Sequence, residues 1–221
     1  MCNHYDPPKQ EQIEAFWRLA KSIQPSWPES LYPYSQGPFI RAGAQPGRQL
    51  VVGQWGLIPH FAKTARSTYP TNNARSEELA EKASYRQPWA KGQRCIIPAV
   101  SFDEPCWETG RNVWWRFRRA DGAPWGLAGL WNSWLDRSTG ALIESYTLLT
   151  INADAHPLMR RMHKPRPDRA ADRQDKRSVI PIESGYVDAW LHGDPVDAKA
   201  LLRLAPNAVF DAAPVPPAAN G

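Results

Sequence analysis

The chain has 221 residues, of which 42% are hydrophobic and 22% charged, enough to bury the core of one domain or at most two small ones. Its three cysteines lack CxxC-like spacing, which argues against a disulfide framework or a zinc site and favours a reducing cytoplasm. It has no apolar signal core and no run of about 20 apolar residues, so we expect a cytoplasmic protein without membrane segments, metal or other cofactor.

Two features of the composition are unusual, a formal net charge of +5 and a total of 11 tryptophans. Basic charge combined with exposed aromatic rings is typical of surfaces that follow a phosphate backbone and stack bases. The alternative is that the tryptophans form the core and the charges are simply solvated. Composition alone leaves both interpretations open.

The first half of the chain predicts helices around several short strands. Apolar residues recur at helical spacing after Gln10, and Pro25 ends this pattern. Ser76 is placed to cap a second helix, with two glutamates in its first turn. The predicted elements are helices over residues 10–23 and 77–83 and strands over residues 39–42, 49–54 and 94–99.

The second half is mostly strands separated by Pro and Gly turns. An extended segment over residues 100–104 is expected to break at Pro105. The other predicted elements are strands over residues 113–118, 127–130, 145–151 and 178–182 and short helices over 186–191 and 197–204. Many short strands with few helices indicate an α+β fold, in which antiparallel β-sheets form a barrel-like core with peripheral helices.

The pattern predicts a single domain over residues 1–205, followed by an Ala/Pro-rich tail, residues 206–221, that we expect to be disordered. The most basic stretch lies before this tail. Residues 160–177 hold eight Lys or Arg against three Asp, and His163 lies among them. A solvated loop is the usual role of such a run, and binding of a polyanion is the alternative.

Cys2 carries the most specific chemistry. A bacterial-type methionine aminopeptidase removes Met1 when the next side chain is as small as cysteine, leaving an amine and a thiol on one residue. The amine, with a pKa of about 7.7–8.0, can condense with an aldehyde to an imine. The thiol can then close on the imine carbon to give a thiazolidine. Many proteins carry Cys2 by chance on an inert N-terminus, so the rest of the chain decides between these interpretations.

Six motifs occur in a specific order between Cys2 and about Trp190. They are Met1-Cys2, Trp55-Gly56-Leu57-Ile58-Pro59, Asn73-Ala74-Arg75-Ser76-Glu77, Arg94-Cys95-Ile96-Ile97-Pro98-Ala99 leading to Glu104, Leu127-Ala128-Gly129-Leu130-Trp131, and His163. Each motif is weak alone, but the ordered set resembles the SOS response-associated peptidase (SRAP) family, which captures abasic sites in DNA.

The resemblance implies that Cys2 forms a thiazolidine with the aldehyde of an abasic site in single-stranded DNA, after self-removal of Met1. It implies that Glu104 supplies protons, that His163 assists opening of the sugar ring, and that Asn73 orients the reacting groups. Asp103 and His156 are the competing acid and histidine. No obligate protein partner is expected. The residues expected to bind DNA are Arg75, Arg160, Arg161, Arg166 and His4.

Three motifs depart from the family's usual pattern. Phe102-Asp103-Glu104-Pro105 stands where an aromatic-Glu-Trp sequence is usual, so the stacking tryptophan is replaced by Pro105, with Trp107 two residues on. His163-Lys164-Pro165-Arg166-Pro167 stands in place of His-x-Arg-Met-Pro, and His4 stands where an arginine is common. These changes affect the expected DNA contacts more than the chemistry, and they indicate a divergent branch.

Two other functions fit the same residues. A thiol peptidase acting on other proteins could use Cys2 as nucleophile and His163 as base. A non-catalytic module would bind intact and abasic single strands alike and leave no covalent product. An imine that fails to close could also support a lyase side activity.

Overall fold

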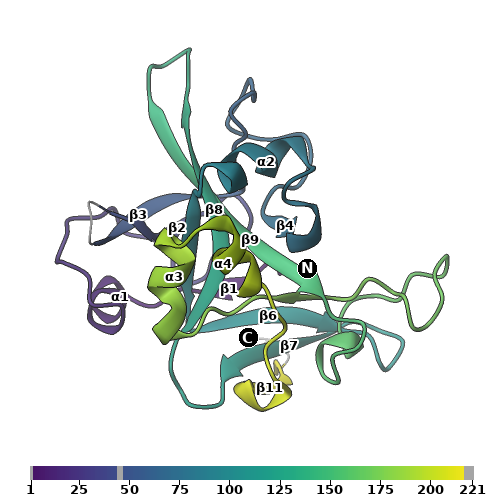
Figure 1. Cartoon of the computed structure of the whole chain (residues 1–221). Helices are drawn as coiled ribbons and strands as arrows, with labels where there is room; N and C mark the ends of the chain where they lie inside the picture. The colour runs from purple at the N-terminus through teal and green to yellow at the C-terminus, as the bar shows by residue number, and fades with distance from the viewer. Residues whose placement is uncertain (1, 44–46, 217–221) are drawn as a thin grey trace, which may run out of the picture.

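In the computed structural model, which describes residues 2–43 and 47–216, five strands close into a barrel. Around the barrel the order is β9, β3, β2, β5, β8 and back to β9, with every pairing antiparallel except that of β3 with β9 (Figure 1). The predicted α+β fold with a barrel-like core is therefore confirmed. The strands are β2 (Gln36–Ala42), β3 (Arg48–Trp55), β5 (Arg94–Ala99), β8 (Trp125–Leu135) and β9 (Leu142–Asn152).

Both faces of the barrel wall are buried, which explains why its strands are apolar along most of their length. Successive side chains of a strand point to opposite faces. Phe39 and Ile97 therefore join one core cluster, which also holds Tyr146, while Ile40 and Ile96 join a second cluster. The second cluster includes the apolar residues of the peripheral helices, so the helices cover the outer wall.

The helices are shorter than predicted, or shifted. They are α1 (Gln10–Phe16), α2 (Ala83–Ala90), α3 (Val187–His192) and α4 (Pro195–Ala200). The helix predicted over residues 10–23 ends at Phe16, because the returning chain hydrogen-bonds the side chains of α1: Ser22 donates to Glu14 and accepts from Gln10. The helix predicted over 77–83 is wrong.

In its place stand a 3-10 turn (Ser76–Glu78) and, after it, α2. The carboxylate of Glu77, expected to favour a helix start, instead accepts from the Arg177 side chain and from the Asn152 backbone. Tertiary contacts thus override the local capping signal. Two short strands, β4 (Asn73–Arg75) and β10 (Arg177–Val179), pair with the end of β9 beyond its barrel contacts.

A second sheet packs below the barrel, with strand order β1 (Tyr5–Asp6), β6 (Ser101–Cys106), β7 (Val113–Arg119) and β11 (Phe210–Pro214) (Figure 1). The predicted disorder of the tail is wrong over residues 207–214, where a 3-10 turn leads into β11. β11 pairs with β7, and Phe210 packs against Phe117 and Trp125. Composition indicated a solvated tail, but this pairing satisfies its backbone. Residues 217–221 of the predicted tail lie outside the described residues.

Among the residues that the structure describes, no helix is long and apolar enough to cross a membrane.

A half-buried charge cluster joins the N-terminal segment to the second sheet. The His4 imidazole hydrogen-bonds to Asp103 at 2.8 Å, and Arg116 donates two hydrogen bonds to the same carboxylate. Asp6 lies 3.4 Å from the other nitrogen of His4. Pairing with Asp103 and Asp6 raises the pKa of His4 to about 9, so this imidazole is a cation at neutral pH.

We expect Gly129→Ala to destabilise the barrel by about 1–3 kcal/mol. An added Cβ would lie 2.7 Å from the Thr147 carbonyl oxygen and 2.6 Å from Ile97 Cδ1, and the strand backbone cannot move aside without breaking the β8–β9 ladder. The control is Gly185→Ala, since nothing lies within 4 Å of that position. Chemical denaturation measures both variants. Equal stability of Gly129→Ala and wild type would contradict the expectation.

The charge cluster predicts a pH-dependent contribution to stability. Because the pKa of His4 is about 9 in the folded protein, against 6.5 ordinarily, its pairing stabilises the fold fully below pH 6.5 and ceases to do so as the pH rises through 9. The loss of melting temperature in His4→Gln should therefore be larger at about pH 6 than at about pH 9.5. The exposed His60→Gln is the control. A loss of equal size at both pH values would show that the imidazole charge contributes nothing.

Candidate active site

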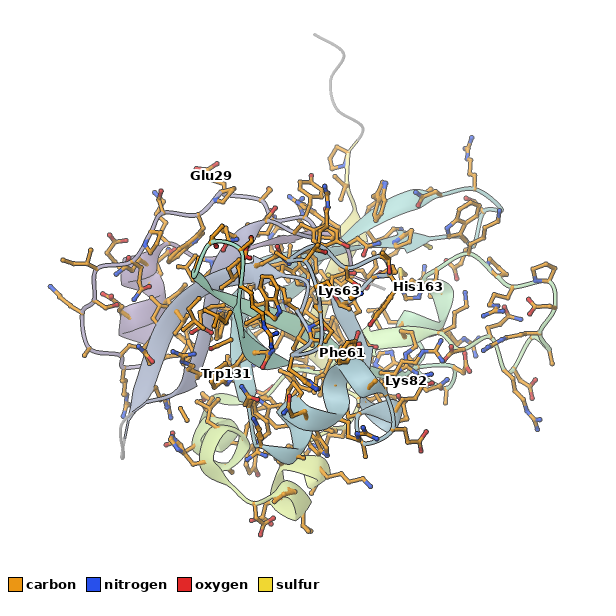
Figure 2. The ribbon with its side chains drawn as sticks, turned by 90° about the horizontal axis from the view of Figure 1, so that it is seen from above. Glu29, Phe61, Lys63, Lys82, Trp131 and His163 are labelled. Carbon is orange, nitrogen blue, oxygen red and sulfur yellow. The ribbon has the colours of Figure 1, made fainter. Side chains whose placement is uncertain are left out.

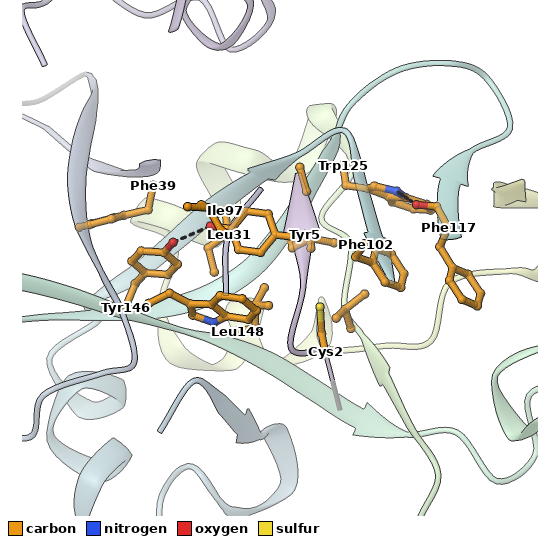
Figure 3. Close-up of a cluster of buried hydrophobic side chains, with 14 of the residues drawn as sticks. Cys2, Tyr5, Leu31, Phe39, Ile97, Phe102, Phe117, Trp125, Tyr146 and Leu148 are labelled. Atoms are coloured by element: carbon orange, nitrogen blue, oxygen red, sulfur yellow. Dashed lines mark hydrogen bonds between the residues drawn. The ribbon is translucent and has the colours of Figure 1, made fainter. Parts of the chain in front are cut away.

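The N-terminal segment is tied to the end of the barrel by two asparagines. Asn73, at the start of β4, donates its side-chain amide to the Cys2 carbonyl at 2.7 Å, and Asn72 donates to the Asn3 side chain at 2.9 Å. The Trp55 indole in turn donates to the Asn72 carbonyl at 2.9 Å. A chain end of this kind usually frays, whereas Cys2 is fully buried, at one side of the core cluster below Tyr5 and Phe102 in Figure 3.

The thiol of Cys2 is a neutral group in this environment. Its Sγ donates to the His4 carbonyl at 3.3 Å. Burial raises the pKa of the thiol well above its ordinary value, and the negative charge of Glu104 raises it further. A proton acceptor is therefore needed before the sulfur can act as a nucleophile.

The buried Glu104 and the partly buried His163 form a pair beside Cys2. β6 directs Glu104 inward, with 1% of the residue exposed, and its carboxylate lies 2.8 Å from Nε2 of His163. Burial by itself raises the pKa of Glu104, but neighbouring positive charge and the hydrogen bond with His163 outweigh it and hold the pKa below its ordinary value. The site thus holds a carboxylate that is close to the thiol and hydrogen-bonded to an imidazole.

The chain around His163 has an unusual backbone. Its φ is +64°, in the left-handed region, which costs a residue other than glycine on the order of 1 kcal/mol. The backbone N–H of His163 donates to the Pro105 carbonyl at 2.6 Å. The predicted break at Pro105 is wrong, because β6 continues to Cys106 and the Pro105 carbonyl is used to hold His163.

Strand alternation separates the two neighbouring carboxylates, as expected. Asp103 points to the opposite side of β6 from Glu104 and pairs with His4 and Arg116, so it lies outside the cluster of Cys2, Asn73, Glu104 and His163.

The competing histidine, His156, is buried elsewhere. Its ring accepts hydrogen bonds from the backbone of Leu158 and Met159, contacts the Ala205 carbonyl and packs edge-on against Phe210.

Three buried polar atoms near the site have no hydrogen-bond partner within the described part of the chain: Asn73 Oδ1, Thr71 Oγ1 and His163 Nδ1. Each unpaired buried group costs about 1–3 kcal/mol. Polar groups of a substrate can relieve that cost. Thr71 and Asn72 were not predicted as site residues, although they immediately precede the motif that begins at Asn73.

A basic groove lies beyond His163. It has a volume of about 410 Å³. Trp107 forms part of the groove wall, and the ammonium group of Lys164 lies 5.2 Å from the centre of its ring. The groove combines cations with one aromatic ring, a combination suited to a nucleic acid strand. Its charged lining residues are Glu108, Arg160, Arg161, Arg169 and Lys176.

The residues predicted to bind DNA differ in their exposure and in their ion pairs. Arg160 and Arg166 are exposed, and Arg161 is partly exposed. Arg161 pairs with Glu108 and Arg166 pairs with Asp168, and phosphate can replace either carboxylate at little cost.

The other two predicted residues, Arg75 and His4, each pair with two carboxylates of the protein. Arg75 pairs with Glu78 and Asp175. His4 is largely buried between its two carboxylates and stacks on Tyr32 at 4.8 Å. Contact with DNA stays a prediction for all five residues. No group of three or more His, Cys, Asp or Glu placed to hold a metal ion occurs in residues 2–43 and 47–216.

Several proteins are similar to this chain. One is the abasic site processing protein YoqW of Bacillus subtilis, 34% identical over 150 residues, which cover 66% of this chain and 63% of that protein. Another is the abasic site processing protein HMCES of Xenopus tropicalis, 29% identical over 219 residues, covering 85% of this chain and 60% of the relative. The chain thus matches less than two thirds of the length of these curated relatives.

A crystal structure of a Bordetella bronchiseptica protein superposes with a TM-score of 0.86 at 37% identity, covering 97% of this chain and all of the other. A Bacteroides thetaiotaomicron protein, at 21% identity and a TM-score of 0.80, shares the fold. The family model described as SOS response associated peptidase (SRAP) matches residues 1–221. Together with the ordered motifs and the cluster around Cys2, this match shows that the chain belongs to the SRAP family.

Proposed function

We propose that this protein captures abasic sites in single-stranded DNA covalently, through a thiazolidine formed by Cys2 after removal of Met1. The names of the curated relatives, abasic site processing proteins, support this substrate. The observation that carries the proposal is the anchoring of Cys2 by Asn73 beside the Glu104–His163 pair. Met1 lies outside the described residues, and its removal, by the protein itself or by an aminopeptidase, is part of the proposal.

The first step joins the Cys2 amine to the aldehyde of the ring-opened sugar. The nitrogen adds to the carbonyl carbon, and a proton passes to the oxygen. The carbinolamine then loses water, with the leaving hydroxyl protonated and a proton released from nitrogen. Glu104 suits this proton traffic because it is buried and hydrogen-bonded to His163, which can exchange protons with it. His163 also suits proton transfer to the ring oxygen when the sugar opens.

The second step closes the thiazolidine ring. The sulfur of Cys2 forms a bond to the imine carbon, the thiol proton leaves, and the nitrogen ends with one proton as a secondary amine. Since the pKa of the thiol is raised, a base must take its proton, and the Glu104 carboxylate is close enough to influence the thiol. The net change for both steps is loss of one water, with no oxidation or reduction. An imine that fails to close supports strand cleavage by β-elimination as a side activity.

The substrate strand is proposed to run along the basic groove. An aldehyde can reach a buried, anchored Cys2 when the damaged nucleotide is unstacked, and a continuous duplex obstructs that approach. Arg160, Arg161 and Arg166 lie on the segment after the barrel where phosphates would follow. Binding through such contacts weakens as salt increases.

Cys2→Ser tests the covalent step. The variant keeps an N-terminal amine after Met1 removal but lacks sulfur, so it should give no conjugate that survives boiling and only an imine that borohydride reduction traps. Wild type and the control Cys106→Ser, another buried cysteine, should both give the heat-stable conjugate. The measurement is a denaturing gel with abasic single-stranded DNA, with intact mass to establish the N-terminus.

Three outcomes would contradict the proposal. Protein that retains Met1 by mass should form no conjugate, so equal conjugation by that form excludes the mechanism. Equal binding of intact and abasic strands, with no covalent product, would indicate the non-covalent module. Cleavage of unrelated proteins that Cys2→Ser loses would instead indicate a peptidase acting in trans.

Glu104→Gln tests the proton transfer. The amide keeps the shape of the side chain but cannot accept and return a proton, so conjugation at saturating DNA should slow by about 100-fold or more. Asp103→Asn is the matched control, because it changes the neighbouring carboxylate, which faces away from Cys2. Single-turnover rates measure both variants. A slower Asp103→Asn than Glu104→Gln would reverse the assignment of the acid.

A further inference from the structure

Lys176 is a buried lysine that the proposed reaction does not use directly. Its ammonium group donates to the Met162 carbonyl at 2.6 Å and to the His163 carbonyl at 2.6 Å. The residue is 7% exposed. Burying an ammonium group is costly unless its hydrogen bonds are satisfied. The two carbonyls supply those hydrogen bonds, so this position has a role that surface solvation does not explain.

His163 and Lys176 flank a loop, which we call the basic arm (residues 164–175). Figure 2, in which His163 is labelled, shows the arm projecting from the body of the molecule. At the returning end, the carboxylate of Asp154 accepts from the backbone N–H groups of Asp175 and Lys176, at 3.0 and 2.8 Å. Lys176 O also accepts from Ala153 N at 2.7 Å. The backbone of Lys176 is therefore fixed to the end of β9.

We propose that Lys176 is a positioning residue that holds the left-handed turn at His163, and thereby keeps the imidazole on Glu104. The proposal rests on the proposed function for its kinetic consequence, but not for its structural one. The backbone of Lys176 is fixed at the end of β9, and its side chain holds the carbonyls of Met162 and His163, just before the arm begins.

The turn needs such a fastening. At a φ of +64° the backbone of His163 is strained, and strain of this kind persists only where the surroundings over-determine it. On one side, the His163 N–H is held by Pro105, and Met162 bridges to Cys106 of β6. On the other side the carbonyls of Met162 and His163 are held by Lys176. Without the ammonium group, two buried carbonyls would lose their partner and the turn could relax.

The proposed contacts of the basic arm with DNA give this fastening a function. The arm carries Arg166, Arg169 and Arg173, and the Gln174 side chain bonds to the backbone of Arg166, Arg169 and Ala170 within it. A DNA strand that moves the arm would displace His163 unless the start of the arm were fastened. Lys176 supplies that fastening, so binding by the arm and the geometry of the Glu104–His163 pair can be independent.

Lys176→Met tests the proposal, with Lys176→Arg as the conservative variant and Lys164→Met as the control. Lys164 is a cation at the start of the arm, and its ammonium group lies over the ring of Trp107 at 5.2 Å. The readouts are the His163 imidazole signals in NMR across a pH titration, and the single-turnover conjugation rate and the affinity for abasic single-stranded DNA.

Lys176→Met is expected to shift the His163 signals and their titration midpoint, and to slow conjugation at saturating DNA by about 10- to 100-fold, the scale of a displacement of about 1 Å in a reacting group. Although Lys176 lines the groove, the residue is only 7% exposed, so the affinity for DNA should change less than the rate. Lys176→Arg should restore most of the rate, and Lys164→Met should leave the His163 signals unchanged.

The proposal is overturned if Lys176→Met leaves the His163 signals and the rate as in wild type, or if Lys164→Met moves both as strongly. If Lys176→Met does not fold, Lys176→Gln, whose shorter amide reaches the carbonyls poorly, replaces it and must show the same displaced signals. If wild-type protein forms no conjugate, the proposed function fails, while the NMR comparison still decides the role of Lys176.

Discussion

The hydrogen bond from Asn73 to the Cys2 carbonyl is the contact on which the site depends. A second residue of a chain normally has no fixed position, and a thiol without a fixed position has no advantage over a small molecule. Here β4 pairs in parallel with β9, which places Asn73 at the open end of the barrel where it meets Cys2. This anchoring gives the thiol of Cys2 a defined position in the fold.

The site lies between two sheets. The barrel contributes Asn73 through β4, while the second sheet contributes Glu104 through β6, and the chain after β9 contributes His163. The N-terminal segment joins the two sheets, because β1 pairs with β6 while Asn72 and Asn73 hold residues 2 and 3. The same strand, β6, separates two carboxylates by alternation: Glu104 faces His163, and Asp103 belongs to the charge cluster around His4.

Positive charge is distributed in two ways. Some cations are committed to the fold: the half-buried His4 and Arg116 hold Asp103, and the buried Lys176 holds the turn at His163. Exposed cations lie in the groove and on the basic arm, where water screens their ion pairs and a phosphate can replace the carboxylate. Net charge alone does not distinguish these groups, and the second group is the more accessible to a polyanion.

The order of motifs along the sequence identified the family, and the local patterns predicted most of the barrel strands and the separation of Asp103 from Glu104. These features follow from side-chain chemistry and from the two-residue period of a strand, which are local properties. The tail at 207–214, the ends of α1 and the partners of Glu77 were decided by contacts with residues distant in sequence, which composition does not encode. The left-handed turn at His163 and its hold by Lys176 belong to the same class, because a 12-residue arm separates the two residues and only the folded chain brings them together.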